Sequence, residues 1–206
     1  MKKARGFLFT AGLVLAMAFT FSCSSDDGDE GGGGGSVSYG GQKYKTVKIG
    51  EQTWMAENLN YAGEDPDNPI GRCYSDDQAN CKKYGRLYNW STALTICPEG
   101  WHLPSDADWT TLTNYVGSST AGTKLKTKSG WDYNGNGTDD FGFSALPGGY
   151  YENGSFAFVG IYGYWWSATE YNSGYAHYRH MICSSSEVIR NDYLKSVLHS
   201  VRCVQD

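Results

Sequence analysis

The clearest helical pattern of apolar residues lies between residues 104 and 117. Apolar side chains recur there at three- and four-residue intervals, as Trp109, Leu112 and Val116. Ser105 and Asp108 stand ahead of them as a capping-box pair, in which each side chain can bond the backbone amide of the other residue. Gly117 then offers a stop. The sequence therefore predicts an amphipathic helix that begins at about Asp106.

Weaker patterns predict the remaining elements. Residues 84–94 place apolar side chains on one helical face, and residues 44–49 and 52–56 alternate around Gly50-Glu51 as a β-hairpin does. Short apolar or aromatic runs separated by Gly, Asn and Ser make the C-terminal half β-rich with long loops. Strands are expected near residues 150–151, 156–158, 164–168, 176–183, 188–190 and 200–204. These patterns predict an α+β domain, with two helices packed on a small, mostly antiparallel and irregular β-sheet.

Length and charge narrow the class of protein. A chain of 206 residues with 40% hydrophobic residues can bury one substantial core, so we expect one folded domain. The net charge of −5 leaves no basic patch for phosphates, which argues against a nucleic-acid partner and disfavours an acidic or polyanionic one.

The first 22 residues have the pattern of an export signal. Three basic residues precede an apolar run, residues 6–21, that is short for a permanent membrane-spanning helix. Cys23, which follows Ser22, resembles a bacterial lipoprotein processing site, so we expect Cys23 to be lipidated; an ordinary cleaved signal is the alternative. Several acyl tails would hold the chain at a membrane, because each buried CH₂ contributes roughly 0.8 kcal/mol.

Residues 23–36 are acidic and then glycine-rich, and are expected to form a flexible tether. Their acidic cluster resembles the signal that sends lipoproteins of Bacteroidetes-type bacteria to the outer face of the outer membrane; a solvated linker is the alternative. The expected organisation is a signal peptide over 1–22, the lipidated Cys23 with its tether over 23–36, and a folded domain over 37–206. We expect a lipid-anchored outer-membrane protein exposed at the cell surface.

Several motifs occur in an order that resembles the Fibrobacter succinogenes major paralogous domain. They are Tyr-Gly-Arg-Leu-Tyr-Asn-Trp at 84–90, Gly-Trp-His-Leu-Pro-Ser-Asp-Ala-Asp-Trp at 100–109, Phe-Gly-Phe-Ser-Ala-Leu-Pro-Gly-Gly at 141–149 and Trp-Trp-Ser-Ala-Thr at 165–169, with shorter matches at 47–50, 52–61 and 200–204. That family is similar to the C-type-lectin-like fold of formylglycine-generating enzymes. The resemblance therefore implies a C-type-lectin-like domain from about residue 40 to the C-terminus.

Five cysteines remain after Cys23, which in an oxidising compartment gives two disulfides and one free thiol. Cys73 and Cys81 bracket a short polar segment that only a crosslink would hold in one shape, so we pair them. A bridge from Cys97 to Cys203 would tie the start of the helix motif to the last apolar run, and lectin-like domains use a long-range bridge in a similar way. Cys183 is then expected to be a free, buried thiol.

One loop resembles the first half of a calcium-binding loop. Asp132, Asn134 and Asn136 place oxygen-bearing side chains at alternate positions, and Asp140 can add a carboxylate. The twelfth position is Phe143, however, where an EF-hand needs a bidentate Glu. A structural Ca²⁺ is the one cofactor that the sequence raises, and an Asn/Gly turn without metal is the alternative.

Enzymatic activity is not expected. The copper site of formylglycine-generating enzymes needs two nearby cysteines, whereas residues 177–183 contain only Cys183, and Cu(I) prefers two thiolates. His177 and His180 would face opposite sides of a strand, which disfavours a shared metal site. The tripeptides through which calcium-dependent lectins hold sugars are also missing from the sequence.

Aromatic residues crowd the C-terminal half, and flat rings stack on the apolar faces of sugars or on protein partners. Candidate ligand-binding residues are Tyr162, Trp165, Tyr171 and Tyr175. The alternative for Trp165 and for its neighbour Trp166 is a place in the core. The expected function is a surface-anchored, non-catalytic binding or adhesion module for a polysaccharide or a surface protein. A structural surface component without a specific ligand and a degenerate relative of formylglycine-generating enzymes are the alternatives.

The lipoprotein assignment predicts that Cys23→Ala releases the protein from membranes or blocks its processing, because the acylated residue is lost. Cell fractionation and labelling with a fatty-acid probe measure both effects, and Cys183→Ala is the matched control that should keep the lipid. Unchanged membrane partition with intact acyl labelling in Cys23→Ala would contradict the assignment.

Overall fold

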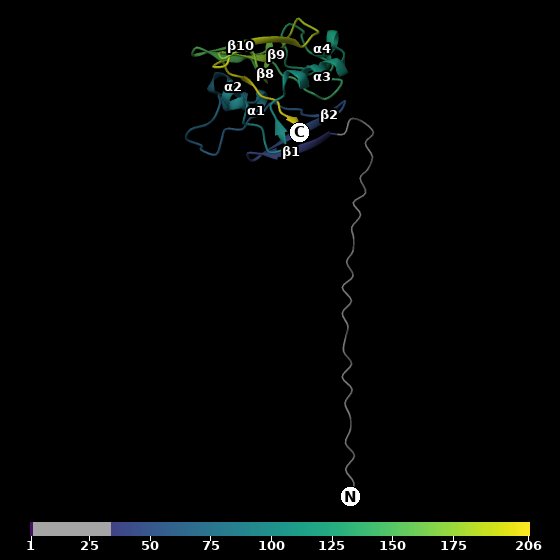
Figure 1. Ribbon diagram of the computed structural model, residues 1–206, viewed down its shortest axis with the longest axis vertical. Helices are drawn as coiled ribbons and strands as arrows, with labels where there is room; N and C mark the ends of the chain where they lie inside the picture. Colours follow the sequence, from purple (N-terminus) through teal and green to yellow (C-terminus); the bar gives the residue numbers. More distant parts are fainter. Residues whose placement is uncertain (2–33) are drawn as a thin grey trace.

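The computed structural model describes residue 1 and residues 34–206 (Figure 1). The expected signal peptide, Cys23 and most of the tether lie outside the described residues. Among those that are described, no helix is both long and apolar enough to cross a membrane. Gly34, Gly35 and Ser36, which we expected in the tether, instead belong to the first strand and pair with residues 45–47.

The first sheet contains the expected N-terminal hairpin, in which β2 pairs antiparallel with β3. On the outer side, β1 reaches β2 through Gly40-Gly41, where both residues have positive φ, as two-residue hairpin turns favour. Two short strands from distant parts of the chain, β12 and β5, complete the sheet on the other side of β3. In spatial order the strands are β1 (Gly34–Tyr39), β2 (Gln42–Ile49), β3 (Gln52–Met55), β12 (Val204–Gln205) and β5 (Trp101–His102).

The second sheet is formed mainly by the C-terminal half. Its spatial order is β10 (Ile189–Leu194), β9 (Tyr175–Ile182), β8 (Tyr162–Glu170), β11 (His199–Ser200) and β4 (Leu87–Tyr88). All neighbours pair antiparallel except β11 and β8. A separate hairpin, β6 (Tyr150–Glu152) and β7 (Ser155–Ala157), touches the region before β11 through Tyr151 and Leu198.

The helix predicted after Pro104 is confirmed as α3 (Asp106–Val116). Ser105 Oγ accepts a hydrogen bond from the Asp108 amide, and the Asp108 carboxylate accepts one from the Ser105 amide, so the capping box is complete. The apolar stripe is buried, and Gly117 follows the last helical residue. The short α4 (Ala121–Leu125) comes next, after the 3₁₀ turn Ser118–Thr120.

The helix expected over residues 84–94 is wrong. After the 3₁₀ turn Tyr74–Asp76, α1 (Gln78–Tyr84) ends at Gly85, which has a φ of 78°; β4 and the four-residue α2 (Trp90–Ala93) follow. A Cβ at Gly85 would lie 2.8 Å from the carbonyl oxygen of Leu59, so this backbone approach requires glycine. The described residues therefore contain four helices rather than the two expected, although the α+β class and the mostly antiparallel sheets are confirmed.

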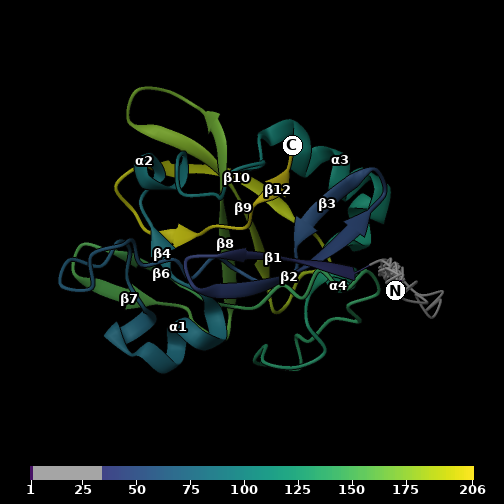
Figure 2. The same cartoon turned by 90° about the horizontal axis from the view of Figure 1, so that it is seen from below.

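Both sheets and the two helices α3 and α4 share a core. In Figure 1, β8, β9 and β10 lie on one side of the domain and β1 and β2 on the other, while α1 and α2 lie at the opposite end from α3 and α4. Figure 2 shows the short strand β12 lying between β3 and the longer strands of the second sheet. Large aromatic side chains fill the space, with ring centroids 4.9 Å apart for Trp54 and Trp109 and 6.4 Å for Trp109 and Trp165.

Two polar side chains, those of Arg202 and Asn58, are buried beside this aromatic core. Arg202, 1% exposed, donates through Nε and Nη2 to Asn58 Oδ1 at 3.1 and 2.8 Å, and through Nη1 to the Phe143 carbonyl. Trp165 Nε1 donates to the same Asn58 oxygen at 2.8 Å, and Asn58 Nδ2 donates to the Tyr84 carbonyl at 2.8 Å. Burial lowers the pKa of Arg202 to about 9, so the guanidinium is still charged at neutral pH.

Both expected disulfides are present. Cys73–Cys81 joins residues eight positions apart, and Cys97–Cys203 joins residues 106 positions apart. Cys183 is free, as expected, but half-buried rather than buried.

Loop length predicts how much each disulfide contributes. Because a crosslink stabilises largely by restricting the unfolded chain, Cys97→Ala/Cys203→Ala should lower the free energy of unfolding by about 4 to 5 kcal/mol, against no more than about 3 kcal/mol for Cys73→Ala/Cys81→Ala. Guanidinium denaturation of the two double variants under identical conditions measures the difference. Equal losses would contradict the loop-length argument.

Candidate functional site: an aromatic pocket

Strand alternation gives β8 and β9 two chemically different faces. Tyr164 pairs with His180 and Trp166 pairs with Tyr178 across the strands, so these four rings lie on one face of the sheet. The alternate residues of both strands point the other way, towards α3 and the shared core; they include Trp165, Arg179 and Met181.

Six aromatic residues surround a cavity on the first of these faces. We call this cavity the aromatic pocket; its volume is about 110 Å³ and its lining residues are Tyr150, Phe158, Tyr164, Tyr178, Tyr193 and His199. They come from β6, β8, β9, β10, β11 and the β7–β8 connection. Tyr164, Tyr178 and His199 are buried, whereas Tyr150 and Tyr193 are half-buried and Phe158 is 46% exposed. The pocket therefore has a buried floor and a rim that reaches solvent.

His199 lies at the centre of the floor. Its ring centroid is 5.0 Å from that of Tyr178, 5.2 Å from Tyr164, 6.2 Å from Tyr150 and 6.5 Å from Tyr193. Burial, assisted by His180, lowers the pKa of His199 to about 3, and burial lowers that of His180 to about 4. Both imidazoles are neutral at pH 7. Within residues 34–206, Nδ1 of each ring lacks a hydrogen-bond partner.

The charge around the pocket is negative. Tyr193 Oη donates to Glu152 Oε2 at 3.1 Å, and burial together with this carboxylate raises the pKa of Tyr193. Burial chiefly, with smaller contributions from Tyr193 and Asp192, raises the pKa of Tyr178 to about 12, so its phenol stays protonated. The six lining residues include no Lys or Arg.

Phe158 is held in an unfavourable backbone conformation. Its φ is 64°, a region in which a bulky side chain costs roughly 1 to 2 kcal/mol. The ring nevertheless lies at the pocket rim, with centroids 5.8 Å from Tyr150 and 5.2 Å from Tyr162. Backbone strain of this kind concentrates at functional sites.

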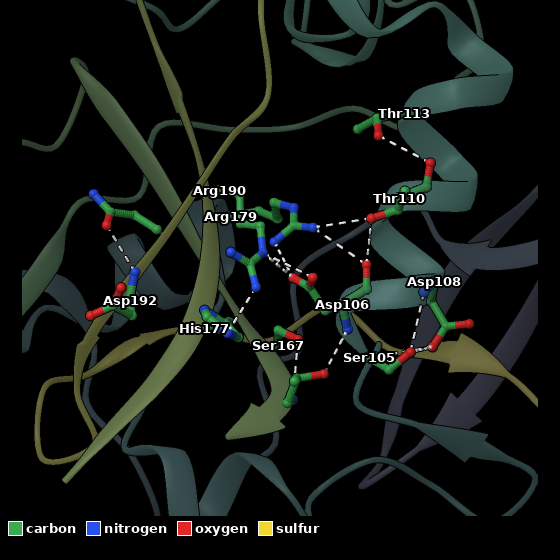
Figure 3. Close-up of polar contacts among 12 residues, drawn as sticks. Ser105, Asp106, Asp108, Thr110, Thr113, Ser167, His177, Arg179, Arg190 and Asp192 are labelled. Atoms are coloured by element: carbon green, nitrogen blue, oxygen red, sulfur yellow. Dashed lines mark hydrogen bonds and ion pairs between the residues drawn. The ribbon is translucent and has the colours of Figure 1, made fainter. Parts of the chain in front are cut away.

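A polar cluster on the opposite face fixes β9 and β10 against α3 (Figure 3). Asp106 Oδ1 accepts a hydrogen bond from Arg179 Nη1 at 2.6 Å, and Asp106 Oδ2 accepts one from Arg190 Nε at 2.9 Å. Burial opposes ionisation of Asp106, but the bonds from both arginines outweigh it and lower the pKa of the carboxyl. Arg190 Nη2 also lies 2.8 Å from His177 Nε2, which places His177 on the face of this cluster. His177 and His180 therefore lie on opposite faces of the sheet, as expected. The cluster holds the strands on which Tyr178 and Tyr193 stand.

The aromatic residues proposed from sequence have different fates. Tyr162 stands beside the pocket, stacked on Tyr164 with centroids 5.4 Å apart and planes 9° apart. The expected ligand-binding role of Trp165 is wrong, because that side chain is fully buried on the opposite face. Tyr171 and Tyr175 are 58% and 38% exposed at the tip of the β8–β9 hairpin, outside the pocket.

None of the four candidates proposed from sequence lines the pocket, so sequence reasoning missed all six lining residues. Tyr193 and His199 reach the pocket through strand pairings that no local pattern reveals. No local pattern separates Phe158 from its apolar neighbours Phe156, Ala157 and Val159, which stand between the same turn formers.

The expected calcium loop uses several of its oxygens internally. Asn136 Oδ1 accepts a hydrogen bond from the Trp131 amide at 3.0 Å, and Asp139, next to Asp140, accepts from the amide and hydroxyl of Ser144. Within the described part of the chain, no group of three or more His, Cys, Asp and Glu side chains gathers as around a metal. A calcium site at Asp132, Asn134, Asn136 and Asp140 stays a prediction.

Broader hollows of about 450 and 640 Å³ flank β2, but their linings are mixed, with several exposed lysines and a single aromatic ring in each. The aromatic pocket differs from both in having a wholly aromatic lining, so we take it as the candidate site.

The family model of the Fibrobacter succinogenes major domain matches residues 47–205. The chain belongs to this family. The match includes all six pocket residues and leaves out β1 and most of β2. The pocket of this Fibrobacter succinogenes major domain therefore lies entirely within the residues that match the family model. No curated protein and no solved structure gives a significant match.

The two neutral histidines predict acid sensitivity. Histidine in an unfolded chain has a pKa near 6.5. Between about pH 6.5 and 4, His180 and His199 are therefore protonated in the unfolded chain but stay neutral in the folded one. The free energy of unfolding should therefore fall with pH, by up to about 1.4 kcal/mol per pH unit for each group. Denaturant unfolding at pH 7, 6 and 5 measures the slope, which should flatten in His180→Gln. An unchanged slope in that variant would contradict the assignment.

Proposed function

We propose that this protein is a non-catalytic binding or adhesion module, held at the cell surface through lipid on Cys23, and that the aromatic pocket is its binding site. The observation that carries the proposal is a cavity open to solvent and lined by six aromatic rings. Concave, mostly apolar sites with a few polar groups are where proteins bind ligands, and aromatic rings contribute large contact areas there.

The conformation of Phe158 supports a binding role. Asn or Gly adopts a positive φ at lower cost than Phe, so the backbone conformation does not favour Phe at this position. A ring kept at the rim at the expense of backbone strain is better accounted for by a ligand that contacts it.

The C-type-lectin-like fold remains part of the proposal. Two mostly antiparallel sheets, the helix motif at α3 and the Cys97–Cys203 bridge support it. On this basis the ligand is a polysaccharide or a surface protein. The first rival function, a structural surface component, does not require a pocket. The second, a degenerate relative of formylglycine-generating enzymes, does not account for the aromatic pocket, because Cys183 lies beside Gly135 and outside the pocket lining.

Phe158→Asn separates binding from stability. The variant removes a rim ring but relieves backbone strain, so we expect saturable binding to be lost while the free energy of unfolding stays equal or rises by up to about 1 to 2 kcal/mol. The measurement is binding of the full-length protein, displayed on cells, to polysaccharide and surface-protein panels, with denaturant unfolding in parallel. Tyr171→Asn, which removes an exposed ring outside the pocket, is the matched control and should bind normally.

Two outcomes would contradict this proposal. If no saturable binding occurs for any panel member, the structural role is favoured. If Tyr171→Asn loses binding and Phe158→Asn does not, the site is the hairpin tip.

A further inference from the structure

The size of the aromatic pocket limits what enters it. Its volume of about 110 Å³ is well below the roughly 300 Å³ at the small end of ordinary ligand sites. Only one compact group, at the end of a larger ligand, is therefore enclosed, while the rest of that ligand lies outside the rim.

The rings enclose this group from several directions. Tyr150 stands at 86° to Tyr164, and Tyr193 stands at 88° to Tyr178, so neighbouring walls are perpendicular. His199 lies nearly parallel to Tyr164, at 18°, and completes the floor. The face of an aromatic ring carries negative potential, so any ring whose face borders the pocket attracts a positive group inside it.

The charges near the pocket reinforce that potential. Glu152 is bonded to Tyr193 at the rim, Asp192 precedes Tyr193 on β10, and His199 of the floor and the nearby His180 are both neutral. The cations of β9 and β10, Arg179 and Arg190, contact Asp106 on the opposite face of the sheet, and Lys195, just after β10, pairs with Glu170. A positively charged group in the pocket therefore meets attraction and no repulsion from the lining residues.

We infer that the aromatic pocket accepts a trimethylammonium group. Such a group is compact, carries its charge behind methyl groups that pack against rings, and is attracted to ring faces within about 6 Å. A bare ammonium is more strongly hydrated and would leave its N–H donors with few acceptors in this pocket. The inference rests on the proposed binding function and names the ligand class for the same site.

Isothermal titration calorimetry on the wild-type, full-length chain tests the charge directly. The chain is kept in a polyoxyethylene detergent, which contains neither ammonium nor sugar. Choline is compared with 3,3-dimethylbutan-1-ol, its uncharged isostere with carbon in place of nitrogen. Choline should bind at least about tenfold more tightly, as expected for a partly desolvated cation–π site. The comparison needs no mutation, so folding defects do not affect it.

Two variants locate the effect. Phe158→Leu keeps apolar volume but removes a ring face, and Glu152→Gln keeps an acceptor for Tyr193 but removes the charge. Each should weaken choline binding by about three- to tenfold. The matched controls are Tyr171→Leu and Glu187→Gln, at exposed positions outside the pocket lining, which should bind choline as the wild type does. Melting curves check that all four variants fold.

The outcomes separate this inference from the proposed function. Parallel titrations with phosphocholine and with Nε-trimethyllysine distinguish a lipid or glycan head group from a modified protein side chain, and preferential binding of either supports the inference. If the isostere binds as tightly as choline, or if a neutral sugar or peptide occupies the pocket and choline does not, the inference is overturned while the binding function stands. If choline fails and no panel ligand binds saturably either, both are overturned.

Discussion

The pair formed by Asn58 and Arg202 is the interaction on which the arrangement of the two sheets depends. One amide oxygen, Asn58 Oδ1, receives the guanidinium of Arg202 and the indole of Trp165, while the amide nitrogen reaches the end of α1. Segments near residues 58, 84, 143, 165 and 202 thus meet at one point. No carboxylate within the described residues is close enough to form an ion pair with Arg202, so carbonyl and amide oxygens and the ring of Phe143, 4.3 Å away, must solvate the charge. Losing any partner would leave a buried donor unmatched, which is costly.

This constraint explains how two strands serve both structure and site. Trp165 is held by Asn58 on the core face of β8, and that orientation places Tyr164 and Trp166 on the other face. The Asp106 cluster does the same for β9, because the bond between Asp106 and Arg179 fixes which face Tyr178 and His180 occupy. The pocket rings are therefore positioned from behind by polar contacts that never touch them. A group entering the pocket would meet walls that are already set, so little side-chain freedom would remain to be lost.

The sequence was sufficient wherever the deciding contacts are local. The capping box of α3, the β2–β3 hairpin and the α+β class follow from residues within a few positions of one another. The prediction of a long helix over 84–94 failed because the close approach of the Leu59 carbonyl requires glycine at residue 85, where the helix ends. The periodicity of apolar residues does not reveal this contact. Trp165 was misassigned because β8 is covered on both faces, so exposure did not alternate as on a half-buried strand. The pocket itself draws on six elements, and only tertiary pairing brings Tyr193 and His199 beside Tyr178.

The Cys97–Cys203 bridge also determines how the molecule would respond to mechanical tension. All six pocket residues lie inside the covalent ring that this bridge closes, whereas β1 lies outside it, at the edge of the first sheet and paired only with β2. A chain held at its N-terminus and pulled through its ligand would peel β1 from β2 one pair at a time, because the force enters at the open end of that hairpin. Beyond residue 97 the force divides between two covalent branches, so the walls around the ligand would outlast the strand by which the domain is held.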